Sequence, residues 1–372
     1  MSDIQDIAGE ALERLEWIDS KKPETAHTKA RAVTRRTALT AGAGALAGLT
    51  MGSPVSAFAS TAAHAASAGS IFGVKSTYKF TMVNHVTTNP FFTPTQYGAS
   101  DACSLLGCSY QWTGSASSNV PQMVSAFNTA IAAGRDGIAC AMIDPAAFTG
   151  PTKNALAKGI PVLSYNADEP NGRLAYIGQD LYVSGQQMGA MIKSLVPSGT
   201  VALFIATPGS ANIQPRIDGA KAALAGSATK FTVTATGAAV PQELTTIEAF
   251  WPGHTSYKGI FAVDGGSTQS CFQTIKKFNL KGKVKCGGYD LTPITQELLA
   301  AGYGQFTIDQ QPYLQGFLPI LELFLYKASG GLSGIADVDT GLKFLNSKTV
   351  VPYNSTKTRY EGTSASPGVA KA

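Results

Sequence analysis

The order of hydrophobic and polar positions predicts alternating strands and helices from about residue 78 onward. Short apolar runs rich in β-branched and aromatic residues are typical of buried strands. The first such runs are "YKFTMVNHV" at 78–86, "CSYQWTG" at 108–114, "GIACAMI" at 137–143, "IPVLSYN" at 160–166 and "LAYIGQD" at 174–180, with helices expected at 92–106, 120–133 and 148–158. Because strands that alternate with helices form parallel sheets covered on both faces, the pattern predicts an α/β fold.

A second series of the same kind follows the first. It starts with an expected helix at 182–195 and ends with an apolar helix at 313–328. Its strand-like runs are "TVALFIA" at 200–206, "FTVTAT" at 231–236, "GIFAVD" at 259–264, "KVKCGGYD" at 283–290 and "YGQFTIDQQP" at 303–312. Two such series predict two doubly wound parallel-sheet lobes rather than one lobe with an appendage.

Residues 1–59 have a different pattern and are expected to lie outside the fold. Arg35 and Arg36, the Ala/Gly/Leu run at 38–49 and the small-residue "AFA" at 57–59 resemble a twin-arginine export signal. The alternative is a basic turn before a buried helix. The apolar run is too short and too rich in glycine for a permanent membrane span. No cysteine stands near the cleavage region, so a lipid anchor is not supported. The mature protein is therefore expected in the periplasm or outside the cell, with a linker at 60–77 and a disordered tail at 355–372.

Composition excludes several classes of protein. The 372 residues are 44% hydrophobic and 14% charged, and the net charge of +5 comes without a dense block of Lys and Arg, which argues against nucleic-acid binding. Four histidines and five cysteines without zinc-site spacing argue against a metal, and no cofactor is expected. In an oxidising compartment Cys103/Cys108 and Cys271/Cys286 are candidate disulfides, whereas Cys140 is expected to be a buried free thiol.

Small polar residues stand where the predicted strands end. They are Asn89, Asn166, Asp168, Asp180, Asp264, Asp290 and Gln310. In open α/β sheets the ligand binds outside the carboxyl ends of the strands, and two sheets place that site in the cleft between them. Carboxylates and amides pair with vicinal hydroxyls, although the same residue types also cap helices. The adjacent Phe91 and Phe92 cannot both point into one core face, so one ring is a candidate wall for a sugar ring.

The segments "TTNPFF", "GIPVLSYNAD", "YIGQDLYVSGQQMG", "NIQPRIDGA", "GIFAVDGGST", "GGYDLTP" and "TIDQQPYLQG" together resemble the type I periplasmic sugar-binding proteins of ABC importers, in the ribose-binding and autoinducer-2-binding group. The resemblance runs from 78 to 344. It implies a three-crossing hinge with crossings near Asp180, at 310–312 and at 339–342. Lobe 1 would then comprise 78–179 and 312–339, and lobe 2 would comprise 180–311 and 340–354.

The resemblance also implies a set of ligand contacts. These are Asn89, Phe91, Phe92, Asn166, Gln214, Asp264, Asp290 and Gln310. The ribose-type pattern has Asp-Arg where this chain has Asn166 and Ala167, Arg in place of Gln214, and Asn in place of Asp264. Losing both arginines argues against ribose, and Asp168 is expected to restore some polarity. Arg216, in an "R-x-x-G" motif, is expected to be structural.

The implied function is capture of a neutral sugar, deoxysugar or polyol by a monomeric protein that delivers it to a membrane permease. An autoinducer-2 or other small-signal receptor module differs only in the partner that recognises the closed form. A glycosidase-like enzyme is a weaker alternative, because no Gly-x-Ser-x-Gly elbow or phosphate loop is present. A transcription repressor of the same fold would need an N-terminal DNA-binding headpiece instead of an export signal.

Replacing both arginines of the signal with lysine tests the export route. We expect Arg35→Lys with Arg36→Lys to leave the precursor in the cytoplasm, because the twin-arginine pathway reads the arginine pair itself. Fractionation followed by immunoblotting measures the distribution. Unchanged export of the double variant would assign the protein to the general secretory route.

Overall fold

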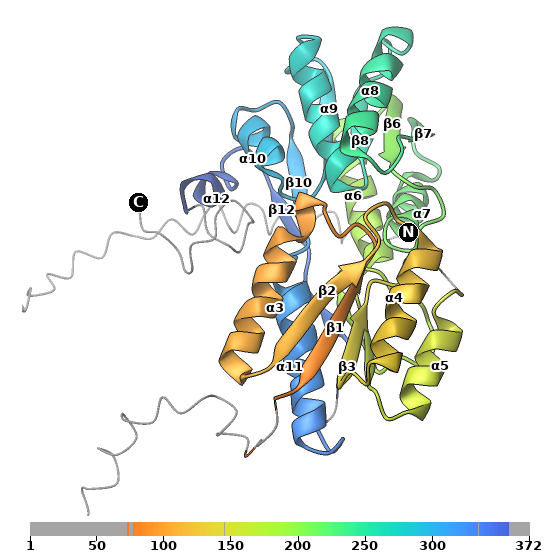
Figure 1. The fold of residues 1–372 in the computed structure, drawn as a ribbon. Coiled ribbons are helices and arrows are strands. Elements are labelled where there is room, and N and C mark those ends of the chain that lie inside the picture. The colour runs from red at the N-terminus through yellow and green to blue at the C-terminus, as the bar shows by residue number, and fades with distance from the viewer. Residues whose placement is uncertain (1–72, 74–76, 145, 334, 357–372) are drawn as a thin grey trace, which may run out of the picture. The chain divides into compact units, whose positions relative to one another are not determined.

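The strands of the described chain form two six-stranded sheets, one in each lobe (Figure 1). The computed structural model describes residue 73 and residues 77–144, 146–333 and 335–356. The predicted export signal at 1–59 lies outside these residues, as do most of the predicted linker at 60–77 and all but two residues of the predicted tail at 355–372.

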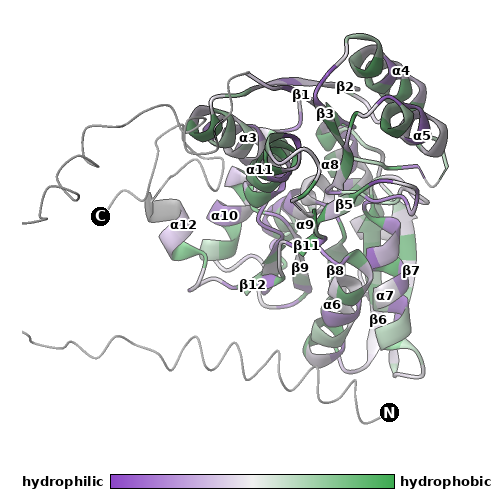
Figure 2. Ribbon diagram, turned by 90° about the horizontal axis from the view of Figure 1, so that it is seen from below, coloured by the Kyte–Doolittle hydropathy of each residue, from purple (hydrophilic) through white to green (hydrophobic). Residues whose placement is uncertain are grey.

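The sheet of lobe 1 has the strand order β11-β5-β4-β3-β1-β2, and all its pairs are parallel. The strands are β1 (Lys79–Asn84), β2 (Ser109–Gly114), β3 (Gly137–Cys140), β4 (Val162–Tyr165), β5 (Ala175–Gly178) and β11 (Val338–Asp339). Helices α3 (Thr93–Leu106) and α11 (Leu314–Ala328) lie side by side on one face, and α4 (Val120–Ala132) and α5 (Thr149–Ala157) cover the other (Figures 1 and 2). A short 3-10 helix, η2 (Pro90–Phe92), precedes α3.

The sheet of lobe 2 has the order β12-β10-β9-β8-β6-β7. The strands are β6 (Gly199–Ile205), β7 (Thr229–Ala235), β8 (Gly259–Ala262), β9 (Lys285–Tyr289), β10 (Phe306–Asp309) and β12 (Lys343–Leu345). Helices α6 (Leu181–Leu195) and α7 (Gln214–Leu224) pack on one face. The other face carries α8 (Val240–Phe250), η3 (Trp251–Gly253), α9 (Gly265–Lys277), α10 (Pro293–Ala300) and α12 (Val351–Thr356).

The chain passes between the two sheets three times. The passages run from β5 to α6, from β10 to α11 and from β11 to β12. The predicted α/β fold of two doubly wound lobes joined by three crossings is therefore confirmed. Two details differ from the sequence pattern. Strand β12 pairs antiparallel with β10, because the chain enters it straight from β11 without a crossover helix, and α12 was not predicted.

Glycines let α6 and α7 approach each other closely in lobe 2. A Cβ atom on Gly219 would lie 2.1 Å from the carbonyl oxygen of Tyr182, and one on Gly185 would lie 2.3 Å from that of Arg216. Real Cβ atoms do not come this close to backbone, so larger residues would push the helices apart. This contact holds Arg216 at the end of α7 that faces the first lobe.

All five cysteines carry free thiols. The nearby Cys108 contributes to the raised pKa of the Cys103 thiol, and Cys286 contributes to that of Cys271. The two candidate disulfide pairs are thus neighbours in space, and Cys140 is fully buried, in agreement with its predicted state. Within the described ranges, the helices are all too short or too polar to cross a membrane.

Substitution of Gly219 measures the closeness of the α6–α7 contact. We expect Gly219→Ala to lower the free energy of unfolding by about 1–3 kcal/mol, because the added methyl group overpacks the interface. Gly150→Ala in α5 is the matched control, since its Cβ would meet nothing within 4 Å, and the control should be neutral or slightly stabilising. Urea unfolding measures both. Equal stability of the two variants would contradict the packing argument.

Candidate ligand-binding site

A cavity of about 470 Å³ lies between the carboxyl ends of the two sheets. Residues of both lobes line it, as expected for a cleft between two doubly wound domains. Seven of the nine residues predicted from the sequence are among them: Asn89, Phe91, Phe92, Asn166, Asp264, Asp290 and Gln310. The direction of the strands explains why these residues meet at one cavity. Four of them lie within two residues of the end of a strand: Asn166, Asp264, Asp290 and Gln310. The other three belong to η2 and its cap.

The first turn of lobe 1 forms one wall of the cavity. Asn89 caps η2, with its side-chain oxygen accepting a hydrogen bond from the backbone N–H of Phe91 at 2.9 Å. Phe92 is 1% exposed and packs in the core of lobe 1, whereas Phe91 is only partly buried. The two rings meet edge to face with centroids 4.7 Å apart. Phe92 thus supports Phe91 from behind, and Phe91 is the ring better placed to contact a ligand.

Asn166, Asp290 and Gln310 form the hinge side of the cavity. Asn166 and Asp290 follow β4 and β9, and both adopt left-handed backbone angles, with φ of 63° and 74°. The Gln310 amide donates to Asp290 Oδ1 at 2.7 Å, and the Asn166 amide donates to Gln310 Oε1 at 3.4 Å. The Asn166 Oδ1 atom is buried and has no protein partner. Strained backbone and an unpaired buried acceptor at one place are typical of a ligand site.

Asp264 and Arg216 contribute charge from lobe 2. Asp264 caps α9, accepting from Ser267 N–H at 2.8 Å and Ala206 N–H at 2.9 Å. Arg216, which was predicted to be structural, also lines the cavity. The Arg216 guanidinium donates to the Val263 carbonyl oxygen at 2.9 Å and stacks 4.0 Å from the Tyr289 ring centroid. Arg216 therefore supports the lobe and faces the ligand space at once.

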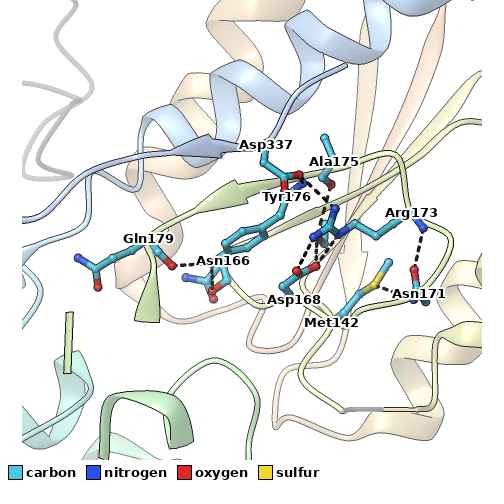
Figure 3. Close-up of polar contacts among 10 residues, drawn as sticks. Met142, Asn166, Asp168, Asn171, Arg173, Ala175, Tyr176, Gln179 and Asp337 are labelled. Carbon is cyan, nitrogen blue, oxygen red and sulfur yellow. Dashed lines mark hydrogen bonds and ion pairs between the residues drawn. The ribbon is translucent and has the colours of Figure 1, made fainter. Parts of the chain in front are cut away.

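Asp168 and Gln214, the other two predicted contacts, do not line the cavity. Asp168 accepts two hydrogen bonds from the Arg173 guanidinium, at 2.6 and 2.7 Å, in a bidentate ion pair next to Tyr176 (Figure 3). The side chain of Gln214 accepts from Gly209 N–H at 2.9 Å and donates to Asp218 at 3.0 Å. Sequence position near a strand end suggested both, but local partners turn both side chains away.

Several polar cavity residues were not predicted, among them His85, Asn212 and Glu243. His85 lies in the strand-like run predicted at 78–86, whereas in the structure it is the first residue after β1. Asn212 belongs to the connection between β6 and α7, and Glu243 lies in the first turn of α8, whereas the contacts predicted in lobe 2 lie at other positions. Their shared signal is a polar residue in a βα connection or in the helix turn that follows it, at the carboxyl edge of a sheet.

Contacts between the lobes close the cavity on one side. His85 Nε2 lies 3.3 Å from the Asn212 side-chain amide, and Ala211 N–H donates to the Ile143 carbonyl oxygen at 2.9 Å. Burial lowers the pKa of His85 to about 4, so the ring is neutral at physiological pH. The structure thus has its lobes closed against each other at this edge.

Burial also controls the charge of the acidic residues. It raises the pKa of Asp290 to about 6, although the nearby Arg216 and the hydrogen bond from Gln310 oppose that rise. Asp290 is therefore mainly ionised at neutral pH and is a strong hydrogen-bond acceptor. The described residues contain no cluster of His, Cys, Asp and Glu suited to a metal ion. The arrangement of acceptors, amide donors and one aromatic ring suits a small polyhydroxylated molecule.

Comparison with known proteins places the chain among proteins of this architecture. A family model described as a periplasmic binding protein domain matches residues 80–328. The chain is 50% identical over 305 residues to the xylose/arabinose-binding protein XylF of Sulfolobus acidocaldarius, covering 77% of this chain and 75% of that protein. A solute-binding protein of Burkholderia graminis in complex with D-arabinose is similar at a TM-score of 0.70 and 28% identity, covering 74% of this chain and 97% of that one. A carbohydrate transporter protein of Acidothermus cellulolyticus in complex with myo-inositol is similar at 0.69 and 26%, covering 78% and 100%.

Alanine substitutions of the two phenylalanines of η2 should differ in their effects on stability and on ligand binding. We expect Phe92→Ala to lower the free energy of unfolding by about 3–5 kcal/mol, because it empties a core position. Phe91→Ala should cost clearly less stability and should weaken sugar binding, because its ring borders the cavity. Thermal unfolding and calorimetric titration of both variants provide the measurements. If Phe91→Ala binds as the unmodified protein does, Phe91 is a packing residue only.

Proposed function

The chain belongs to the periplasmic binding protein domain family, and we propose that it is the substrate-binding component of an ABC importer that captures a neutral sugar or polyol. The family resemblance deduced from the sequence motifs is thereby confirmed. The observation that carries the proposal is the cavity between the carboxyl ends of both sheets, where Asn89, Asn166, Asp290 and Gln310 surround a space of about 470 Å³. That size suits a monosaccharide or cyclitol.

The relatives narrow the ligand class. XylF of Sulfolobus acidocaldarius is named for xylose and arabinose, and the two similar structures hold D-arabinose and myo-inositol. These ligands are uncharged and carry several adjacent hydroxyl groups. In this chain, Asp290 and Asp264 would accept from hydroxyls, the amides of Asn89 and Gln310 would donate, and Phe91 would pack against the C–H face of the ring.

Transport requires that the bound form differ from the free form. Closing two lobes over a ligand shifts the equilibrium by the difference in affinity between the closed and open states. A membrane permease would recognise the closed form of a single chain, after export by the twin-arginine signal predicted at the N-terminus. The receptor alternative uses the same closure and replaces the permease with a signalling partner. A glycosidase-like activity has less support, because the family consists of substrate-binding proteins.

Titration of the mature protein with neutral sugars tests the proposal. We expect one-to-one binding of D-xylose or L-arabinose without turnover. A sugar present at 100 times its dissociation constant should stabilise the fold by about 2.7 kcal/mol. The affinity should change little between low and high salt, because the ligand carries no charge. A flat thermal-shift screen across pentoses, hexoses, deoxysugars, polyols and autoinducer-2 would contradict the proposal.

Gln310 and Gln214 provide a matched test and control for the same titration with sugars. Gln310→Ala should weaken binding at least about tenfold, or 1.4 kcal/mol, because the side chain lies in the cavity and orients Asp290. Gln214→Ala is the control, since this side chain bonds only within the start of α7 and the turn before it. Asp290→Ala should resemble Gln310→Ala. Equal losses in the two glutamine variants would place the binding site elsewhere.

A further inference from the structure

A pair of carboxyl groups lies in the wall of the cavity that lobe 2 contributes. Glu243, in the first turn of α8, is 3% exposed and lines the cavity together with Asp264. Its carboxyl group packs directly on the start of α9. A Cβ atom on Gly266 would lie only 1.9 Å from Glu243 Oε2. The absence of a side chain at Gly266 is therefore what admits Glu243 to this position.

Burial raises the pKa of both Glu243 and Asp264, and the charge of Asp264 adds to the rise at Glu243, so the two carboxyl groups are close neighbours. Ionised carboxylates only accept hydrogen bonds, so a bond between two of them requires a proton. Asp264 already accepts from two backbone N–H groups, which favours its ionised form. Among the described residues, no backbone N–H group is seen to donate to the Glu243 carboxyl group. The proton therefore resides mainly on Glu243.

The Glu243 Oε2 atom is buried and has no hydrogen-bond partner in the protein. A buried, unpaired oxygen costs free energy unless a ligand or water supplies the missing donor. Because the residue borders the cavity, a hydroxyl group of a bound sugar is a suitable donor.

We propose that Glu243 and Asp264 hold one proton between them and that Glu243 Oε2 accepts a hydrogen bond from a ligand hydroxyl. The proposal rests on the sugar-binding function proposed above and adds a determinant of specificity to it. Sharing the proton leaves the pair with a single negative charge. Together with Arg216 and the ionised Asp290, the pair then leaves the cavity with about one excess negative charge rather than two. A ligand with an additional carboxylate or phosphate would be repelled at this wall.

The titration of Glu243 can be isolated from that of its neighbours. Burial, followed by the charge of Asp264, raises the pKa of Glu243 to about 9. Asp264, the partner in the shared proton, has its own pKa raised by burial. Two other titratable groups that border the cavity lie outside this range, with pKa values of about 6 for Asp290 and about 4 for His85. Tyr289, against Arg216, has its pKa raised to about 12 by burial. Between pH 7 and 9, Glu243 is thus the cavity group that loses its proton.

The first test uses the ligand-free protein, so that it stands even if no sugar binds. The native state retains a proton that the unfolded chain has lost above pH 4.5, so stability conferred by this proton declines as pH rises towards 9. We expect the folding equilibrium of the unmodified protein to fall about tenfold per pH unit relative to Glu243→Gln between pH 7 and 9. Glu248→Gln, in the same helix and ion-paired with Lys277, is the matched control and should not change this slope. Parallel pH profiles of the unmodified protein and Glu243→Gln would overturn the shared proton.

The second test measures binding of D-xylose and L-arabinose at pH 7 by calorimetric titration. Glu243→Ala should weaken binding at least about tenfold more than Glu243→Gln does, because glutamine keeps both a donor to Asp264 and an acceptor towards the cavity. Gly266→Ala should resemble Glu243→Ala, since it displaces the carboxyl group while leaving a good helix former in α9. Similar affinities of the alanine and glutamine variants would overturn the ligand contact. Absence of binding by the unmodified protein would instead contradict the proposed function.

Discussion

The side chain of Gln310 joins the two lobes at the hinge side of the cavity. Its amide donates to Asp290 in lobe 2 at 2.7 Å, and its oxygen accepts from Asn166 of lobe 1 at 3.4 Å and from Gln315 of α11 at 3.1 Å. Its backbone carbonyl oxygen accepts from Thr340 at 2.8 Å, in the third crossing between the lobes. One residue thus links two of the three crossings to ligand-facing groups of both lobes. Any change in the angle between the lobes must alter this network.

Backbone strain at the ends of β4 and β9 places side chains from both lobes in one network. Left-handed backbone angles at Asn166 and Asp290 turn the chain sharply after each strand, so that both side chains face Gln310. Such conformations cost free energy for residues other than glycine. Asn and Asp tolerate them better than most residues. The two equivalent turns show how similar lobes build one site from opposite sides.

The charges of the acidic side chains in the cavity depend on burial as much as on nearby cations. Arg216 is buried in lobe 2, where the Val263 carbonyl oxygen and the Tyr289 ring hold its guanidinium. Its positive charge opposes the effect of burial on Asp290 and keeps that carboxyl group mainly ionised at neutral pH. The acidic groups near Asp264 have no such cation among their hydrogen-bond partners, and burial raises the pKa of Asp264. Two acidic centres in one cavity therefore have different protonation behaviour, as their environments dictate.

The sequence by itself determined the two-lobed α/β fold and most of the candidate site. Hydrophobic periodicity identifies strands and helices, and parallel strands necessarily bring their carboxyl ends to one edge, which is why Asn166, Asp264 and Asp290 could be predicted. Only the tertiary structure decided which polar residues near that edge face inward. The Asp168 side chain is turned away by Arg173, and Glu243 is brought in by packing on Gly266. Arg173 lies near Asp168 in the sequence but is also ion-paired with Asp337 of a distant segment, and Glu243 reaches Gly266 only because α8 packs on α9. Local pattern along the chain carries no information about those contacts.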